Sequence, residues 1–386
     1  MMACKKCGNR NPEYFGIRKN GERYCRLCLS FNGEAASVNP DLKERKAEVV
    51  LSYSLSGEQK EISARLLKSY RENRDSLIYA VCGAGKTELV YATMAYALSK
   101  GRQVGFTVPR RDVVIELAER IKEAFPSFKV VSVYKDHTDE LVGDIVVLTT
   151  HQLYRYENYF DLLIIDEADA FPFRNQPVLH AFFHLSVKGN YIMMSATPSR
   201  EMKDEIRDRN GTYLTLMRRY HHHPLIVPKA IVFPFFSEAL VLFELLKFQR
   251  KHLPTLVFTP TIDECERLFR IVGKMIRRGN FVHSERANRS EIIAGFKRGE
   301  YDFLVTTSVL ERGVTLKNLQ VIVFHADSEI YDDRTLIQIS GRVGRKIDAW
   351  SGEAIFLCNR KTAEIRDSIK EIEEANRSLC ADAKSA

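Results

Sequence analysis

The sequence lacks the segments that would carry the chain into or across a membrane. No apolar stretch follows residues 1–6, so we expect no secretory signal. The most apolar long window, residues 230–246, contains Pro234, Glu238 and Glu244. It falls short of the roughly 20 apolar residues that a membrane-spanning helix needs. We interpret this window as a buried strand followed by a core helix, and we expect a cytoplasmic protein.

Cysteine is scarce outside the start of the chain. Four of the eight cysteines lie within the first 28 residues, and the other four are scattered. This distribution is not that of a disulfide framework. Clustered cysteine pairs in a cytosolic chain more often bind metal.

The overall composition is that of an ordinary globular protein. Charged residues make up 28% and hydrophobic residues 45%, which leaves enough apolar material for packed cores. At roughly 100–200 residues per domain, a chain of 386 residues suggests two or three domains. The net charge of +8 favours a polyanionic partner, because cations that neutralise phosphates release counterions.

An α/β pattern occurs twice along the chain, without any short repeat. Short apolar runs bounded by polar turns indicate buried strands, and the amphipathic segments between them indicate crossover helices of parallel sheets. The first series of expected strands is 77–80, 104–108, 130–133, 145–148, 162–165 and 191–194. The second series is 231–233, 256–258, 303–305, 321–324 and 354–357, followed by a charged helix over 362–378.

Changes in composition divide the chain into five parts. A polar stretch with two prolines near residues 217–228 interrupts the α/β pattern and suggests an interdomain linker. The expected parts are a cysteine-rich module (1–35), a linker with a short helix over 42–51 (36–54), a first lobe (55–216), the interdomain linker (217–229) and a second lobe (230–386).

A glycine-rich turn follows the first expected strand. The segment AVCGAGKT, residues 80–87, lies between a strand-like and a helix-like run. Glycine lets such a turn curl so that backbone N–H groups face phosphate oxygens, and the following helix adds its positive end. Lys86 would reach the β- and γ-phosphates of ATP, and the Thr87 hydroxyl would bind Mg²⁺. The predicted nucleotide-binding residues of this turn are Gly83, Ala84, Gly85, Lys86 and Thr87.

Two adjacent carboxylates follow another expected strand. In DLLIIDEAD, residues 161–169, Asp166 and Glu167 come after an apolar run, at the strand end where parallel sheets bind ligands. Asp166 would hold Mg²⁺, and Glu167 would orient and deprotonate the attacking water. Such a pair alone is usually a solvated strand end. Here it lies 80 residues after Lys86 on a second buried strand, which favours a catalytic role.

Further segments resemble helicase motifs in order and spacing. SAT (195–197), TTSVLERGVT (306–315) and QISGRVGR (338–345) resemble motifs III, V and VI of superfamily 2 helicases. The resemblance implies an α/β fold with two RecA-like parallel-sheet lobes in tandem, which follow the small N-terminal cysteine-rich module. ATP would bind to the first lobe.

The same resemblance assigns further nucleotide-binding and catalytic residues. Arg342 and Arg345 of the second lobe would act as arginine fingers, with Gln338 near the γ-phosphate. Positive charge supplied from the other lobe would link hydrolysis to lobe closure. Gly313 of the motif V segment would contact the nucleotide. Gln59, 27 residues before Lys86, resembles the glutamine that recognises adenine.

Short polar side chains and arginines follow strand ends in both lobes. Such groups suit phosphate contacts that position a strand without reading its bases. Each threonine among them could instead cap the next helix. The predicted nucleic-acid contacts are Pro109, Arg110, Arg111, Thr150 and His151 in the first lobe, and Thr259, Thr306 and Thr307 in the second.

Two CxxC pairs predict a zinc site at the start of the chain. Cys4 and Cys7 are separated from Cys25 and Cys28 by 17 residues, and four thiolates complete a tetrahedral Zn²⁺ site. Basic and aromatic residues within 9–24 could stack on single strands. Alternatively, the module is a structural knob whose aromatic residues shield the metal. We interpret the histidines at 221–223 as a solvated or hinge segment.

The combination of motifs resembles one family, the competence protein ComFA. The residues that carry the likeness are the four-cysteine module, AVCGAGKTE (80–88), TTHQL (149–153), DLLIIDEADAFP (161–172), LERGVT (310–315) and IQISGRVGR (337–345). It spans essentially the whole chain. It implies a cytosolic ATPase that uses ATP, Mg²⁺ and Zn²⁺ and is stimulated by single-stranded DNA. Such a protein would help to draw transforming DNA through a membrane channel, with other competence proteins at the inner face of the membrane.

Three alternatives are kept beside this interpretation. A PriA-like replication-restart or repair helicase would carry a larger metal module later in the sequence. An RNA helicase would use similar phosphate contacts, because discrimination often depends on the 2′-OH. A non-catalytic nucleic-acid-binding scaffold would not need the intact ATP-site residues. Translocation with or without strand separation fits the sequence equally, as do a monomer and an oligomer.

Overall fold

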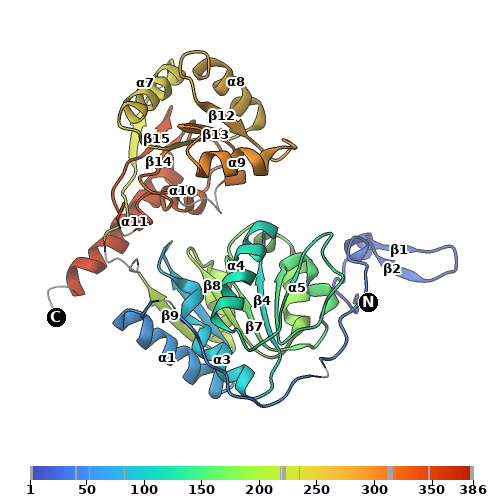
Figure 1. Cartoon of the computed structure of the whole chain (residues 1–386). Helices are drawn as coiled ribbons and strands as arrows, with labels where there is room; N and C mark the ends of the chain where they lie inside the picture. The colour runs from blue at the N-terminus through green and yellow to red at the C-terminus, as the bar shows by residue number, and fades with distance from the viewer. Residues whose placement is uncertain are drawn as a thin grey trace. The chain divides into compact units, whose positions relative to one another are not determined.

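The computed structural model describes residues 3–39, 41–51, 53–81, 83–217, 219, 223–233, 235–310, 316–346 and 348–382 (Figure 1). The chain divides into two compact units. The first unit comprises Met1–Ala80 and Gly85–Leu216, and the second comprises Val81–Ala84 and Met217–Ala386. The N-terminal cysteines therefore belong to the same unit as the first α/β series.

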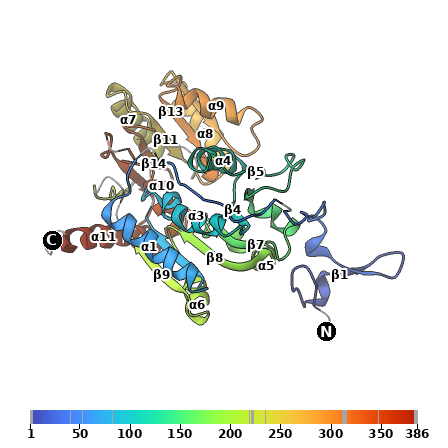
Figure 2. The same ribbon diagram turned by 60° about the horizontal axis from the view of Figure 1, so that its bottom comes forward.

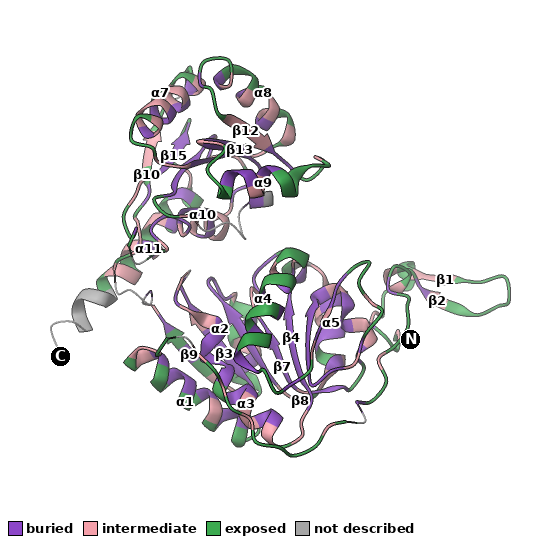
Figure 3. Ribbon diagram, viewed as in Figure 1, coloured by how far each residue is buried: buried purple, intermediate pink, exposed green. Residues whose placement is uncertain are grey.

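The first unit is built on a seven-stranded parallel sheet with the strand order β5-β6-β4-β7-β8-β3-β9. Its strands are β3 (Ser76–Ala80), β4 (Val104–Val108), β5 (Val130–Val133), β6 (Ile145–Thr149), β7 (Phe160–Ile165), β8 (Val187–Ser195) and β9 (Thr212–Leu216). Its helices are α1 (Gly57–Arg71), α2 (Lys86–Leu89), α3 (Tyr91–Ser99), α4 (Arg111–Ala124), α5 (Pro177–Ser186) and α6 (Arg200–Asp208), with the 3-10 turns η3 (Thr150–Arg155) and η4 (Phe173–Asn175). The central strands are buried along their length because helices cover the sheet (Figure 3).

The predicted apolar runs are confirmed as strands of this sheet. β4 and β5 have the predicted bounds, and β3, β6, β7 and β8 extend the predicted runs. The sequence did not predict β9, the last strand in the order. Its side chains alternate between buried and accessible, so it contains no continuous apolar run.

The helix predicted over residues 42–51 is wrong. The segment has no regular secondary structure and lies along the surface of the first unit. The Val50 N–H donates to the Ala124 carbonyl at 2.9 Å, and the Arg45 guanidinium lies 4.3 Å from the centroid of the Phe128 ring. These contacts with the sheet unit take the place of helical hydrogen bonds, and the first helix begins only at α1.

The second unit contains a six-stranded parallel sheet with the order β10-β15-β14-β11-β13-β12. Its strands are β10 (Lys229–Val232), β11 (Thr255–Phe258), β12 (Gly279–Val282), β13 (Phe303–Thr306), β14 (Gln320–Val323) and β15 (Ala354–Cys358). Its helices are α7 (Ser237–Arg250), α8 (Ile262–Val272), α9 (Arg289–Lys297), α10 (Asp333–Ser340) and α11 (Ala363–Asp382), with the 3-10 turn η5 (Ser308–Leu310). The fold class predicted from the sequence, two parallel-sheet α/β lobes in tandem, is confirmed.

The apolar window at residues 230–246 separates into β10 and the first part of α7. The expectation that its strand is buried is wrong. β10 lies at the end of the strand order, and Val232 is 47% exposed. Among the described residues, every helix is too short or too polar to span a bilayer.

The N-terminal module is a small hairpin with a short 3-10 turn on either side. Its elements are η1 (Pro12–Tyr14), β1 (Phe15–Ile17), β2 (Arg23–Cys25) and η2 (Arg26–Cys28). The hairpin β1–β2 extends away from the sheet on the side of α5 (Figure 1, Figure 2). At its base, Cys7, Cys25 and Phe31 belong to the same buried hydrophobic cluster as residues of β7, η3 and α5. The module is therefore packed onto the first unit.

Candidate active site and metal centre

The glycine-rich turn joins β3 to α2. Gly83 and Gly85 have φ angles of +83° and +74°, which residues with a side chain seldom adopt. Gly85 is the N-cap of α2, so the helix begins at Lys86. This is the backbone arrangement that surrounds a phosphate with N–H groups at a helix start.

Lys86 lies beside the acidic pair that follows β7. Lys86 Nζ is 3.8 Å from Asp166 Oδ1, and the two side chains are 14% and 18% exposed. The Glu167 N–H donates to Asp166 Oδ1 at 2.8 Å. Glu167 itself has a φ of +56°, a conformation that is uncommon for residues other than glycine and that clusters at functional sites. The structure thus brings together the three residues that the sequence assigned to phosphate, metal and water.

The environment of Asp166 suits a bound cation. Burial raises the pKa of Asp166, while the Lys86 ammonium lowers it. A divalent cation would stabilise the ionised carboxylate further. Carboxylate and hydroxyl oxygens are ligands that Mg²⁺ accepts, and both Asp166 and Thr87 lie at this end of the sheet. The residues present therefore fit Mg²⁺.

Asp169 connects the acidic segment to the end of β8. Its carboxylate accepts hydrogen bonds from the hydroxyls of Ser195 at 2.7 Å and Thr197 at 3.0 Å. All three residues are at most 5% exposed. The two segments that the sequence compared with separate helicase motifs are thus joined by one buried network.

Gln59 lies against the glycine-rich turn, near the start of α1. A Cβ atom at Gly85 would come within 2.7 Å of Gln59 Nε2, so the amide packs directly on this glycine. Gln59 Oε1 also accepts a hydrogen bond from the Ser56 N–H at 2.9 Å, as part of a capping box. Its position next to the turn agrees with the predicted contact to adenine, which stays a prediction.

Glu88 forms a network beside the same turn that the sequence did not predict. It is 5% exposed and forms an ion pair with Arg120 of α4. The Tyr53 hydroxyl donates to Glu88, and both burial and this carboxylate raise the pKa of Tyr53. The network connects α2, α4 and the segment before α1. Only the tertiary structure reveals it, because no spacing in the sequence relates these three residues.

In the second unit, the predicted catalytic residues lie on α10 and the turn after it. Gln338 is 4% exposed and Arg342 is 1% exposed. Arg345 Nε donates to the Gly341 carbonyl at 2.9 Å. The two arginines are therefore held in an ordered turn at the end of one helix.

Arg219 holds this turn from the segment that the sequence assigned to the interdomain linker. Its guanidinium donates to the carbonyls of Gly341, Val343 and Gly344 at 3.1, 2.8 and 2.5 Å. Arg219 is 1% exposed. The sequence gave no signal for this contact, since a single arginine in a polar stretch has no recognisable pattern.

Some predicted residues lie outside the described part of the chain. They include Gly313, together with the rest of 311–315, and the first two of the three histidines at 221–223. His223 is described, and its ring stacks on Trp350 with centroids 4.2 Å apart.

The predicted nucleic-acid contacts of the first unit follow two neighbouring strands. Pro109, Arg110 and Arg111 come directly after β4, and Thr150 and His151 follow β6. Val108 pairs with Thr149 in the sheet, so the two loops leave the same edge side by side. Arg111 is exposed and His151 is partly exposed, whereas Thr150 is 0% exposed. The Thr150 hydroxyl is therefore not presented to a strand in this structure.

In the second unit, two predicted hydroxyl contacts are not supported. Thr259 and Thr306 are 0% exposed. Thr259 Oγ1 donates to the Thr306 carbonyl at 3.2 Å, and Thr306 Oγ1 donates to the Thr307 carbonyl at 3.1 Å. These hydroxyls hold the strand ends together instead of facing solvent. Thr307 is 8% exposed, and its contact with nucleic acid stays a prediction.

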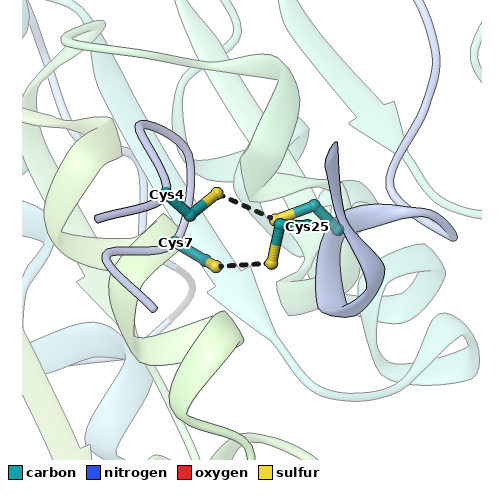
Figure 4. A group of neighbouring side chains, drawn as sticks. Cys4, Cys7 and Cys25 are labelled. Atoms are coloured by element: carbon teal, nitrogen blue, oxygen red, sulfur yellow. Dashed lines mark hydrogen bonds between the residues drawn. The ribbon is translucent and has the colours of Figure 1, made fainter. Parts of the chain in front are cut away.

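The four N-terminal cysteines form a compact cluster (Figure 4). Their sulfur atoms all lie within 4.8 Å of one another, with Cys4 and Cys28 at 3.8 Å and Cys7 and Cys25 at 3.6 Å. Zn–S bonds of about 2.3 Å in a tetrahedron place sulfur atoms about 3.8 Å apart. Burial raises the pKa of Cys7 to about 11 and that of Cys28 still further, so a bound cation would favour the thiolate forms of these two residues. The cluster therefore fits Zn²⁺.

Two family models match the two sheets. Residues 52–200 match the type III restriction enzyme res subunit, and residues 238–346 match the helicase conserved C-terminal domain. Among solved structures, Saccharomyces cerevisiae Dbp5 bound to RNA and ADP BeF3 has a TM-score of 0.63 at 18% identity, covering 83% of this chain and 88% of that one. The DUF1998 helicase MrfA bound to DNA has a TM-score of 0.56 at 15% identity, covering 86% of this chain and 52% of that one. Fold and motifs together define a superfamily 2 helicase with two RecA-like lobes.

Whole-length relatives narrow this class to one family. The competence protein ComFA of Streptococcus pneumoniae (strain ATCC BAA-255 / R6) is 34% identical, covering 97% of this chain and 90% of that protein. The ComFA of Bacillus subtilis (strain 168) is 30% identical, covering 97% of this chain and 85% of that protein. UvrABC system protein B of Chlorobium phaeobacteroides (strain BS1) is 30% identical, but covers only 52% of this chain. The chain belongs to the ComFA family, as the sequence predicted, and the PriA-like alternative is set aside.

Proposed function

We propose that this protein is an ATP-driven translocase for single-stranded DNA that contributes to the uptake of transforming DNA. One observation carries the proposal: in a ComFA-family chain, Lys86, Asp166 and Glu167 meet at the end of one parallel sheet. An inactive scaffold would have no need for this arrangement. The net charge of +8 agrees with a polyanionic partner.

The residues of the first lobe have separate roles in the proposed hydrolysis of ATP. The turn at Gly83–Gly85 would surround the phosphates, and the Lys86 ammonium would exchange Asp166 for the β- and γ-phosphate oxygens. Mg²⁺, held by Thr87 and Asp166, would neutralise charge on the phosphates. Glu167 would orient the attacking water and accept its proton.

The second lobe would complete the site for the γ-phosphate. We assign Gln338 to positioning, and Arg342 and Arg345 to stabilising the charge that develops during phosphoryl transfer. Arg219 would support them indirectly, by holding the turn to which both arginines belong. Closure of the lobes around ATP would then couple hydrolysis to movement along the strand.

The cellular setting of the proposal follows from the family. Relatives that carry the name competence protein suggest that this chain acts in the cytoplasm, at the inner face of the membrane, together with other competence proteins.

Steady-state ATP hydrolysis tests the proposal. The purified chain is assayed alone and with single-stranded DNA, duplex DNA or RNA, beside Lys86→Ala. We expect strong stimulation by single-stranded DNA, and none in the variant, because it lacks the ammonium on the phosphates. Stimulation mainly by RNA would contradict the DNA assignment. Rates equal to those of Lys86→Ala under every condition would contradict the motor itself.

A further inference from the structure

A half-open cavity lies between the cysteine module and the first lobe. It has a volume of about 1180 Å³, large enough for a nucleotide-sized ligand. One wall comes from the module, including Asn9, Tyr14 and Phe31, and the facing wall comes from the loops after β4 and β6. All of these residues belong to the first unit, so the cavity lies inside one compact body.

The two walls are fixed to each other by several contacts. The Phe31 ring lies nearly parallel to the His151 ring, with centroids 6.3 Å apart, and packs edge-on against Phe182 at 4.9 Å. The Tyr154 hydroxyl donates to the Asn32 carbonyl at 3.1 Å. These contacts join Phe31 and Asn32, which follow Cys28 closely, to η3. The cysteine cluster therefore helps to fix the position of the module wall relative to η3.

The lining combines flat aromatic surfaces with positive charge. Tyr14, His151 and Tyr154 contribute rings, and burial lowers the pKa of His151, which favours its neutral form. Arg111 and Lys135 supply cations, while the described lining contains no aspartate or glutamate. The Arg111 guanidinium also lies 4.9 Å from the centroid of the Tyr134 ring. Rings for bases and cations for phosphates are the combination that binds unpaired strands.

The position of the cavity matches the edge of the sheet where a strand is expected. Pro109, Arg111, Thr149 and His151 line it, and they come from two loops that leave β4 and β6 side by side. A strand positioned by these loops would reach the module wall within the same cavity.

We propose that this cavity binds a nucleotide of single-stranded DNA, with the base held between the cysteine module and η3 and its phosphate near Arg111 and Lys135. The proposal rests on the function proposed above and adds to it a binding role for the module. The sequence left two roles open for the module, stacking on single strands or only shielding the metal, and the proposal favours the first. It assigns the contact with DNA to Tyr14 rather than to the basic residues of the exposed hairpin.

Photo-crosslinking to the full chain tests the location directly. An oligothymidylate containing 5-iododeoxyuridine is irradiated in complex with the protein, and the modified residue is identified by mass spectrometry. We expect adducts on Tyr14, His151 or Tyr154, because their rings line the cavity. Adducts confined to other parts of the chain would overturn the proposal, even if the DNA binds and stimulates hydrolysis. The matching oligouridylate serves as a competitor, and competition equal to that of the DNA would overturn the assignment to DNA.

A pair of tyrosine variants tests the wall of the module. Tyr14→Ala removes a ring from the cavity, whereas Tyr24→Ala removes one from the same module that packs on Gly16 and does not line the cavity. We expect binding of fluorescent oligothymidylate to weaken about tenfold in Tyr14→Ala, within the range for one stacked base, and to hold in Tyr24→Ala. The zinc content of both variants shows whether the module has stayed folded. Equal affinities in two zinc-loaded variants would contradict the proposal.

A lysine pair provides a readout that does not depend on the fold of the module. Lys135 lines the cavity, and Lys43 is exposed elsewhere on the same unit. Lys135→Ala should reduce the slope of log affinity against log salt by about 0.7, the value for one phosphate contact on a single strand, and Lys43→Ala should leave it unchanged. An unchanged slope in Lys135→Ala would contradict the proposed contact between Lys135 and a phosphate. If the wild-type chain bound no DNA at all, that result would contradict the proposed function itself, and not only the assignment of the cavity.

Discussion

Asp169 joins two segments of the first lobe through buried hydrogen bonds. It is a buried carboxylate, and its two oxygens accept from Ser195 and Thr197. A buried carboxylate is costly unless its hydrogen bonds are made. The two hydroxyls therefore help to hold the acidic segment against the end of β8, together with the hydrogen bond that the Ala168 N–H donates to the Met194 carbonyl at 3.1 Å.

Replacing one of these hydroxyls should lower stability measurably. In Ser195→Ala, Asp169 keeps Thr197 but loses its 2.7 Å donor. We expect the free energy of unfolding of the first lobe to fall by about 1–3 kcal/mol, the cost of a buried polar group left unsatisfied. Urea unfolding measures the change. Ser127→Ala, at an exposed position, is the control, and an equal effect of both substitutions would show that the Asp169 network contributes nothing.

The residues of the ATP site differ in how far the sequence could predict them. Lys86, Asp166 and Glu167 were predictable because phosphate and metal chemistry requires certain residue types at strand ends, and strand ends can be recognised in the sequence. Arg219 and the Glu88–Arg120 pair were not predictable. Their partners are distant in the sequence, and their role depends on packing alone.

Among the elements, helix α1 serves two purposes at its first turn. Ser56 and Gln59 form a capping box that satisfies backbone N–H groups at the helix start. The same Gln59 amide packs on Gly85 of the phosphate-binding turn. The Gln59 side chain therefore contributes both to the stability of α1 and to the proposed contact with adenine.

Two substitutions at the start of α1 should separate the stabilising role from the proposed recognition of adenine. Ser56→Ala removes the acceptor for the Gln59 N–H, so we expect the free energy of unfolding to fall by about 1 kcal/mol while the preference for ATP over GTP persists. Gln59→Ala should also weaken that preference, because the amide would no longer be present to recognise adenine. KM values for ATP and GTP measure the difference. Loss of nucleotide preference in Ser56→Ala alone would assign selectivity to the position of the helix rather than to the amide.

The elements that the sequence predicted are those whose burial shows as a continuous apolar run. β4 is buried along its whole length and has the predicted bounds, and β5 also has the predicted bounds although only every second residue of it is fully buried. β9 and β12 were missed because polar or small residues interrupt their apolar runs. The helix predicted over 42–51 failed because the segment contacts the first unit through the Val50 N–H and the Arg45 guanidinium while it is extended. Tertiary contacts thus overrode the local pattern.

At the scale of the whole molecule, the cysteine cluster and the first lobe share one hydrophobic core. Cys7, Cys25 and Phe31 pack in the cluster that includes Phe182 and Tyr156. A module with its own separate core would not affect the lobe when its metal is removed. Because the core is shared, loss of the metal should lower the stability of the whole first unit.

Removing one cysteine ligand tests this connection. Cys7→Ser should reduce zinc from about one ion per chain to almost none, because a structural site needs four ligands. The melting temperature of the first unit should fall by more than about 2–4 °C, the shift that 1 kcal/mol produces in a unit of this size. Cys265→Ala, a buried cysteine of the second unit, is the control and should keep its zinc. Full zinc retention in Cys7→Ser would contradict the four-cysteine site.

The strand order of the first sheet has a consequence for the synthesis of the chain. β3, which carries the phosphate-binding turn, is the first strand of its sheet in the sequence, yet it pairs with the last two, β8 and β9. Pairing between such distant segments is slow, because a long loop must close before the contact forms. On the ribosome, β3 therefore emerges well before its partners and stays unpaired until β8, which ends at residue 195, has been made. The strand that carries the phosphate-binding turn is thus among the last of the first unit to be paired, and it is exposed in the nascent chain for a long interval.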